Sequence, residues 1–155
     1  MRHLRISALT AAVLAVALIA SAEERDRAKI PDKFKWNLAD LYPTEEAWRA
    51  AKDKLVAAVP KAATFKGTLG SSPARLADAL DTVNALGKDL QRVYLYASLL
   101  ADQDTRVSKY QGMLQEMQQI AANFGQQVAY VEPEILKIDK ATIDGWVGSE
   151  PRLKT

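Results

Sequence analysis

SPARLADALDTVNALGKDLQRVYLYASLLAD, residues 72–102, is the stretch that decides the fold. Ser72 followed by Pro73 is typical of a helix start, because serine can cap the first turn and proline fits the first helical position. The apolar residues then recur at alternating steps of four and three, which places them on one helix face: Leu76, Leu80, Val83, Gly87, Leu90, Tyr94, Ala97 and Ala101. So long a stripe needs a packing partner along its length. The stretch therefore predicts a helix over 73–102 within a hairpin or bundle.

Gly87 lies inside this stripe, where glycine costs about 1 kcal/mol relative to alanine. We interpret Gly87 as a point of close helix approach or of a mild bend. A break into two helices is the alternative.

A second stripe supplies the partner. Its members again lie three or four residues apart and predict a helix over 106–131: Tyr110, Met113, Met117, Ile120, Phe124, Val128 and Val131. The polar segment 102–105 joins the two as a short turn, which favours an antiparallel helical hairpin. Further helices are predicted at 44–59, with Thr44 as its cap, and at 140–147. No useful strand alternation is present, so we predict an all-α fold.

The N-terminal residues 1–22 are typical of a secretory signal peptide. Arg2 and Arg5 precede an apolar run, and Ala20-Ser21-Ala22 is an A-x-A cleavage pattern. The run is short for a membrane span, although an uncleaved anchor is the alternative. We therefore expect export to the periplasm or beyond, an extended arm at 23–35 and a helical domain at 36–155.

Removing the two leader arginines lowers the Lys+Arg count from 21 to 19, which equals the 19 acidic residues. The formal charge of +2 therefore falls to zero. We expect neither nucleic acid nor, after signal cleavage, a membrane as a partner, because no electropositive field remains.

The chain has few of the residue types that most often catalyse reactions or bind metals. It has no cysteine, and its one histidine, His3, lies in the predicted signal. The mature part thus has no imidazole and no thiol, the usual general base and the usual soft metal ligands. We predict no catalytic, cofactor-binding or metal-binding residue.

Two carboxylate pairs were candidates for a site. Asp102 and Asp104 do not fit an EF-hand loop, because its sixth position would be Val107 instead of glycine. We assign them to helix termination and capping. Glu132 and Glu134 flank Pro133, but no converging group is visible in the sequence, so we assign them to a turn.

The aromatic and sulfur side chains favour packing over ligand binding. Tyr94 and Tyr96 point to different helix faces, so one is predicted to be core and the other could face a cavity. The remaining large residues are predicted to be apolar anchors or core filler: Trp36, Trp48, Trp146, Met113 and Met117.

An ordered set of short motifs resembles the oligoendopeptidase F family of zinc metallopeptidases, which is related to thimet oligopeptidase. The opening KWNLADLYP differs at Asn37, where the family usually has aspartate. The motifs are KWNLADLYP at 35–43 with Trp48, FKG at 65–67, YLYA at 94–97 with DQDT at 102–105, and EPEIL at 132–136.

The resemblance covers only the N-terminal helical domain of that family. It implies one wall of a channel that admits oligopeptides, while zinc is held by an H-E-x-x-H motif and a further glutamate far downstream. No such motif occurs in this sequence. We therefore expect a partial oligoendopeptidase F-like protein, inactive alone, whose oligopeptide substrates are cleaved by a catalytic domain absent from this sequence. A free-standing exported helical module that binds peptides or proteins is the alternative, and a decayed gene product is a third.

Overall fold

The computed structural model describes residues 29–154. The chain divides into two units, Met1–Lys35 and Trp36–Thr155, which we treat separately. The predicted signal peptide and residues 23–28 of the predicted arm lie outside the described residues. In the described part of the first unit, η2 (Asp32–Phe34) forms one 3-10 turn within the arm expected to be extended. The Lys35 ammonium pairs with the Asp32 carboxylate at 2.9 Å.

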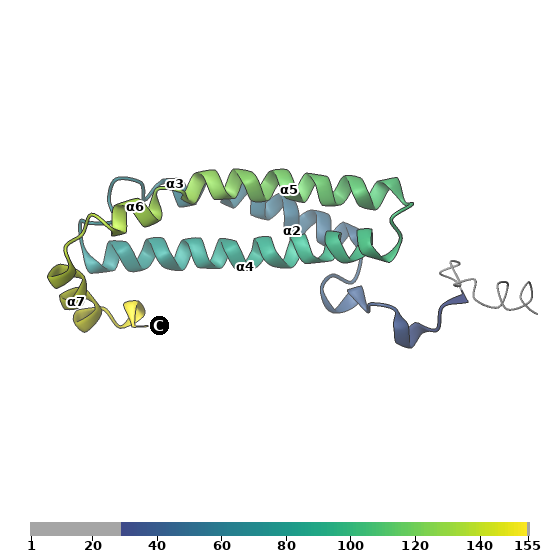
Figure 1. Cartoon of the computed structure of the whole chain (residues 1–155), viewed down its shortest axis with the longest axis horizontal. Coiled ribbons are helices and arrows are strands. Elements are labelled where there is room, and N and C mark those ends of the chain that lie inside the picture. Colours follow the sequence, from purple (N-terminus) through teal and green to yellow (C-terminus); the bar gives the residue numbers. More distant parts are fainter. Residues whose placement is uncertain (1–28, 155) are drawn as a thin grey trace, which may run out of the picture. The chain divides into compact units, whose positions relative to one another are not determined.

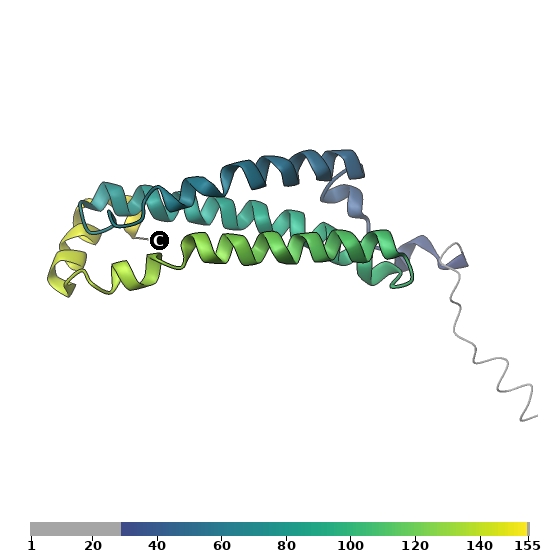
Figure 2. The ribbon, with the colours of Figure 1, turned by 90° about the horizontal axis from the view of Figure 1, so that it is seen from above.

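Within its described residues, every regular element of the second unit is a helix (Figure 1). Its three longer helices, α2, α4 and α5, lie side by side in both views (Figure 2), with α4 and α5 antiparallel. This confirms the predicted all-α hairpin and bundle. The elements are η3 (Leu38–Asp40), α2 (Glu45–Ala58), α3 (Pro60–Ala63), α4 (Pro73–Gln103), α5 (Ser108–Val128), α6 (Val131–Ile135), α7 (Lys140–Ser149) and η4 (Pro151–Leu153).

Side-chain caps fix three of the helix starts. The Thr44 hydroxyl accepts from the amide of Ala47 at 3.2 Å, and the Ser72 hydroxyl accepts from the amide of Arg75 at 3.1 Å. Asp139 caps α7 in the same way. Each cap satisfies an amide that has no partner inside the first turn, which is why the predicted starts agree closely with the structure.

The helix interiors and ends differ from the prediction in two places. The predicted helix 44–59 does end as α2 at Ala58, and the short helix α3 follows it directly, because proline is tolerated in a first turn. The predicted helix 106–131 ends earlier, as α5 at Val128, and the separate helix α6 begins at Val131 with Pro133 in its first turn. Finally, α4 is unbroken at Gly87, and nothing lies within 4 Å of a Cβ placed there. Neither a break nor a close helix approach therefore explains Gly87.

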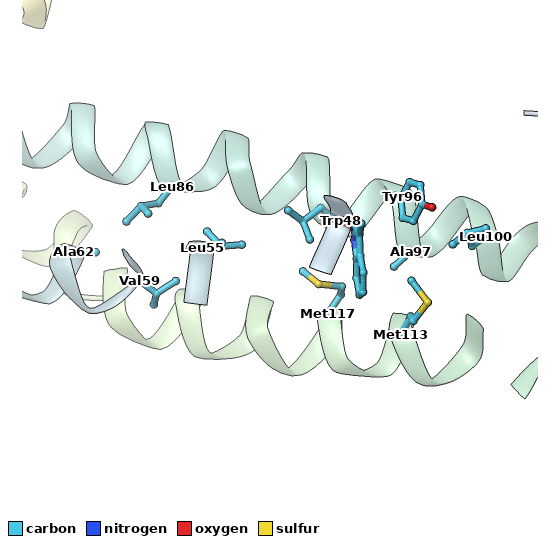
Figure 3. Packing of buried hydrophobic residues seen from close by; sticks show 11 residues of the cluster. Trp48, Leu55, Val59, Ala62, Leu86, Tyr96, Ala97, Leu100, Met113 and Met117 are labelled. Carbon is cyan, nitrogen blue, oxygen red and sulfur yellow. The ribbon is translucent and has the colours of Figure 1, made fainter. Parts of the chain in front are cut away.

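Two apolar clusters form the core. The larger one fills the space between α2, α4 and α5 around Trp48, whose side chain is 0% exposed (Figure 3). The smaller one joins Phe65, Leu69, Leu76 and Ala79 to partly buried side chains of α6, α7 and η4. Met113 and Met117 are buried in the larger cluster, as predicted.

The three tryptophans have different surroundings. Trp48 is a core anchor, and Trp146 is half-buried against the smaller cluster. The prediction that Trp36 is an anchor is wrong, because its side chain is 60% exposed. Trp36 precedes every helix of the second unit, so no helical face directs it towards the core.

Within residues 29–154, no helix combines the length and the apolar character needed to cross a bilayer.

Candidate functional site

The carboxylate of Glu134 joins two sequence motifs that lie far apart in the chain. It accepts a hydrogen bond from the amide of Gly67 at 2.6 Å and a longer one from the amide of Leu69 at 3.4 Å. Gly67 has a φ of 79°, a left-handed conformation that favours glycine. The structure therefore brings FKG and EPEIL together through one side chain. The assignment of Glu134 to a turn is wrong, because the residue lies in α6 and its carboxylate makes a contact across the fold.

Tyr130 reinforces the same junction. Its hydroxyl donates to the carbonyl oxygen of Ala62 at 2.5 Å. Burial raises the pKa of Tyr130, and the nearby Glu134 carboxylate adds to that rise. The phenol is consequently kept protonated as a donor, and α3 is held against the segment that leads into α6.

An aromatic group lies in the larger cluster. The Tyr96 ring stacks on Trp48, with centroids 6.0 Å apart, and meets the edge of Tyr42 at 5.6 Å. The indole N–H of Trp48 donates to the Val93 carbonyl oxygen at 2.9 Å. Of the tyrosine pair that the sequence singled out, Tyr96 is thus the core residue, and its pKa is raised by burial.

Tyr94 is partly buried and packs against the same cluster. It lines neither of the two grooves described below.

The acidic pair at the end of α4 serves local structure. Asp104 is the residue that follows α4, and its carboxylate accepts from the backbone amide of Arg106 at 3.0 Å and from the guanidinium at 2.7 and 2.8 Å. Asp102 is exposed in the last turn of α4. Asp104 agrees with the predicted role in helix termination and capping, whereas the exposed Asp102 side chain makes no such contact with the described residues.

Ion pairs tie α2 to α5. Glu45 pairs with Lys109 of α5 at 2.5 Å and with Arg49 of its own helix at 2.7 Å. These two cations lower the pKa of the Glu45 carboxyl, with the Lys109 hydrogen bond contributing most. Lys52 and Glu116 form a second bridge, and the hydrogen bond from that pair raises the pKa of Lys52.

Two grooves open at the end of the bundle where α4 begins and α5 ends. The polar groove, of about 490 Å³, is lined by Gly67, Gly70, Glu134, Lys137, Ile138, Asp139 and Thr142. The carboxylates of Glu134 and Asp139 are already engaged there, the latter by the amide and hydroxyl of Thr142.

The second groove, which we call the apolar groove, has a volume of about 350 Å³. It is lined by Val83 of α4, by Val128 at the end of α5 with Ala129 directly after it, and by Val131, Glu132, Ile135 and Leu136. This groove could not be predicted from the sequence, because Val83 and Leu136 are distant in the chain and only the helix packing brings them together. Of its lining residues, the sequence had indicated only Glu132 as a candidate for a site.

The described residues do not fit a zinc site. Among residues 29–154, no three side chains of the histidine, cysteine, aspartate and glutamate types lie close enough to hold a metal ion. Zinc is bound by imidazole nitrogen, thiolate sulfur and carboxylate oxygen. Here only carboxylates occur, since the single histidine is His3. No chemical step can be derived through a zinc ion on these residues.

Comparison with known proteins finds sequence relatives that are oligoendopeptidases. No protein-family model matches the chain. Oligoendopeptidase F of Lactococcus lactis subsp. cremoris (the plasmid form) is 31% identical over 131 residues, which are 84% of this chain and 22% of that protein. Oligopeptidase PepF of Bacillus subtilis is 30% identical over 142 residues, 88% of this chain and 21% of that protein. The chain thus spans about a fifth of the length of these relatives.

Solved structures share the fold. The crystal structure of oligoendopeptidase-F from Enterococcus faecium superimposes with a TM-score of 0.67 at 24% identity, covering 72% of this chain and 22% of that one. A Chlamydophila abortus protein superimposes with a TM-score of 0.73 at 23% identity, covering 85% and 22%. These matches confirm the predicted resemblance: over most of its length, the chain is related to a segment of the oligoendopeptidase F family.

Proposed function

We propose that residues 36–154 form a helical wall of the peptide channel in a peptidase of the oligoendopeptidase F kind, which hydrolyses oligopeptides. The observation that carries this proposal is the similarity to oligoendopeptidases over 84% of the chain. The architecture supports it, because two long antiparallel helices packed on the larger apolar cluster make a stiff surface.

This proposal assigns the hydrolytic step to residues other than these. The resemblance implies zinc chemistry, in which the metal activates water, and the described side chains offer no donor set for it. We therefore propose that the chain by itself does not cleave peptides. Its own residues would orient and confine the substrate.

The inactivity is tested with the purified full chain, zinc chloride and an internally quenched peptide. We expect no cleavage above that of zinc chloride alone, and no sub-micromolar zinc binding in calorimetry. Cleavage that is abolished by a chelator and restored by zinc would contradict this part of the proposal.

The role as a channel wall is tested by replacement. Residues 36–154 are inserted in place of the matching segment of Bacillus subtilis PepF, and peptide hydrolysis is measured. We expect the chimera to retain hydrolysis, whereas a variant with the segment deleted should lose it. A chimera that is folded by circular dichroism and binds zinc but is inactive would argue against the role.

We also propose that the chain is exported, on the basis of the signal-like residues 1–22. Cell fractionation followed by N-terminal sequencing provides the test. A mature N-terminus at Glu23 in the periplasm or medium is expected, and retention of Met1 in the cytoplasm would refute export.

A further inference from the structure

The lining of the apolar groove combines apolar side chains with one charged residue. Valine, isoleucine and leucine side chains line it, and Glu132 is its single charged member. Leu136 at its edge is 76% exposed, which is more than Phe34 or Trp36. An apolar side chain of this size gains about 1.5–3 kcal/mol on full burial, so the groove favours an apolar occupant.

Glu132 is exposed, and its carboxylate makes no hydrogen bond or ion pair with any other described residue. This separates it from Glu134 two positions later, whose carboxylate is engaged by backbone amides. A carboxylate beside apolar walls attracts a cation more strongly than one surrounded by water. The complementary group is therefore a positive charge next to the apolar one.

The C-terminal half of α5, which leads to the groove, is uncharged. No charged residue occurs between Met117 and Val131, so the exposed positions there carry amides and small side chains, among them Gln119, Gln126 and Ala129, which directly follows α5. Ala129 also lines the groove. Glutamine amides both donate and accept hydrogen bonds, as the main chain of a peptide does. This face therefore neither repels nor selects a peptide by charge until Glu132 is reached.

We propose that the apolar groove is a selective subsite for oligopeptides, which takes a large apolar side chain while Glu132 pairs with a basic residue adjacent to it. The proposal rests on the proposed function, since it names which peptides this wall prefers. It commits to a peptide as the occupant because an unpaired carboxylate, an apolar floor and an amide-lined approach together match a peptide of that composition.

The test measures binding of fluorescein-labelled hexapeptides to the full chain by polarisation. The probes have the sequences Gly-Gly-Leu-Arg-Gly-Gly, Gly-Gly-Leu-Glu-Gly-Gly and Gly-Gly-Ala-Arg-Gly-Gly, with blocked N-termini. The Leu-Arg peptide should bind tightest. Glu132→Gln should weaken its binding by about threefold to fivefold, the range of an exposed ion pair. Leu136→Ala should weaken it by about tenfold.

Reversing the charge of Glu132 gives the most discriminating experiment. Glu132→Lys should make the Leu-Glu peptide the better ligand, which a merely structural effect would not do. Asp102→Asn, an exposed carboxylate in the last turn of α4, is the matched control and should change nothing. Amide shifts in a nitrogen–proton NMR spectrum should concentrate at 128–136.

Three results would overturn the subsite. Equal affinity for the Leu-Arg and Leu-Glu peptides, with shifts elsewhere on the bundle, would refute the groove but leave the proposed function standing. No peptide binding at all would contradict both. A dimer in sedimentation that Leu136→Ala converts to a monomer would assign the groove to a second copy of the chain.

Discussion

Replacing Trp48 by phenylalanine tests whether α2 is held to α4 in the way that the structure indicates. The substitution keeps a ring that can stack on Tyr96 but removes the N–H that donates to the Val93 carbonyl at 2.9 Å. The lost hydrogen bond costs about 1 kcal/mol. The two ring carbons that phenylalanine lacks cost about 1.6 kcal/mol at about 0.8 kcal/mol for each buried carbon group. We therefore expect Trp48→Phe to lower the free energy of unfolding by about 2–3 kcal/mol.

Urea denaturation followed by circular dichroism at the helical band measures this free energy. The midpoint should fall while the slope stays constant, since the surface exposed on unfolding is unchanged. Trp36→Phe is the matched control, because the same atoms are removed from a side chain that is 60% exposed. It should change the free energy by no more than about 0.5 kcal/mol. Equal effects of the two substitutions, or a loss below about 1 kcal/mol at Trp48, would refute the reasoning.

Three further outcomes are expected. Glu134→Ala should speed hydrogen exchange at the Gly67 amide, measured by NMR, whereas Glu132→Ala should not, because only Glu134 accepts from that amide; equal exchange would remove the proposed contact. The pKa of Glu45 is lowered by its two cationic neighbours, so its stabilising effect is complete above its unfolded pKa of about 4.5 and is lost as pH falls through the lower folded value. Glu45→Gln should therefore flatten the acid limb of a plot of unfolding free energy against pH, and an unchanged limb would contradict the assignment. Gly87→Ala should raise the free energy of unfolding by about 0.5–1 kcal/mol, because alanine is the better helix former and its Cβ meets nothing within 4 Å; a decrease in the denaturation midpoint would show that the glycine is required.

The long helices were predictable because apolar residues that pack on one helix face recur every three or four residues along the sequence. The stripes beginning at Leu76 and Tyr110 led to α4 and α5, and the caps Thr44 and Ser72 fixed two starts. Trp36 was mispredicted because its apolar character was visible in the sequence whereas its lack of a helical context was not.

The contacts between distant segments were not predictable. The sequence suggests a turn at Glu134, but nothing local indicates that its carboxylate reaches an amide 67 residues away. The apolar groove has the same origin, since Val83 approaches Leu136 only after α4, α5 and α6 have packed. These contacts form only when the helices pack, so the spacing of residues along the sequence cannot predict them.

The three tryptophans differ in solvent exposure, so their intrinsic fluorescence can report on the structure. Trp48 is sealed in the core, Trp146 is half-buried and Trp36 lies mostly in solvent. Acrylamide should therefore quench Trp36 readily and Trp48 hardly at all. The emission spectrum would follow opening of the α2–α4 contact without any attached dye.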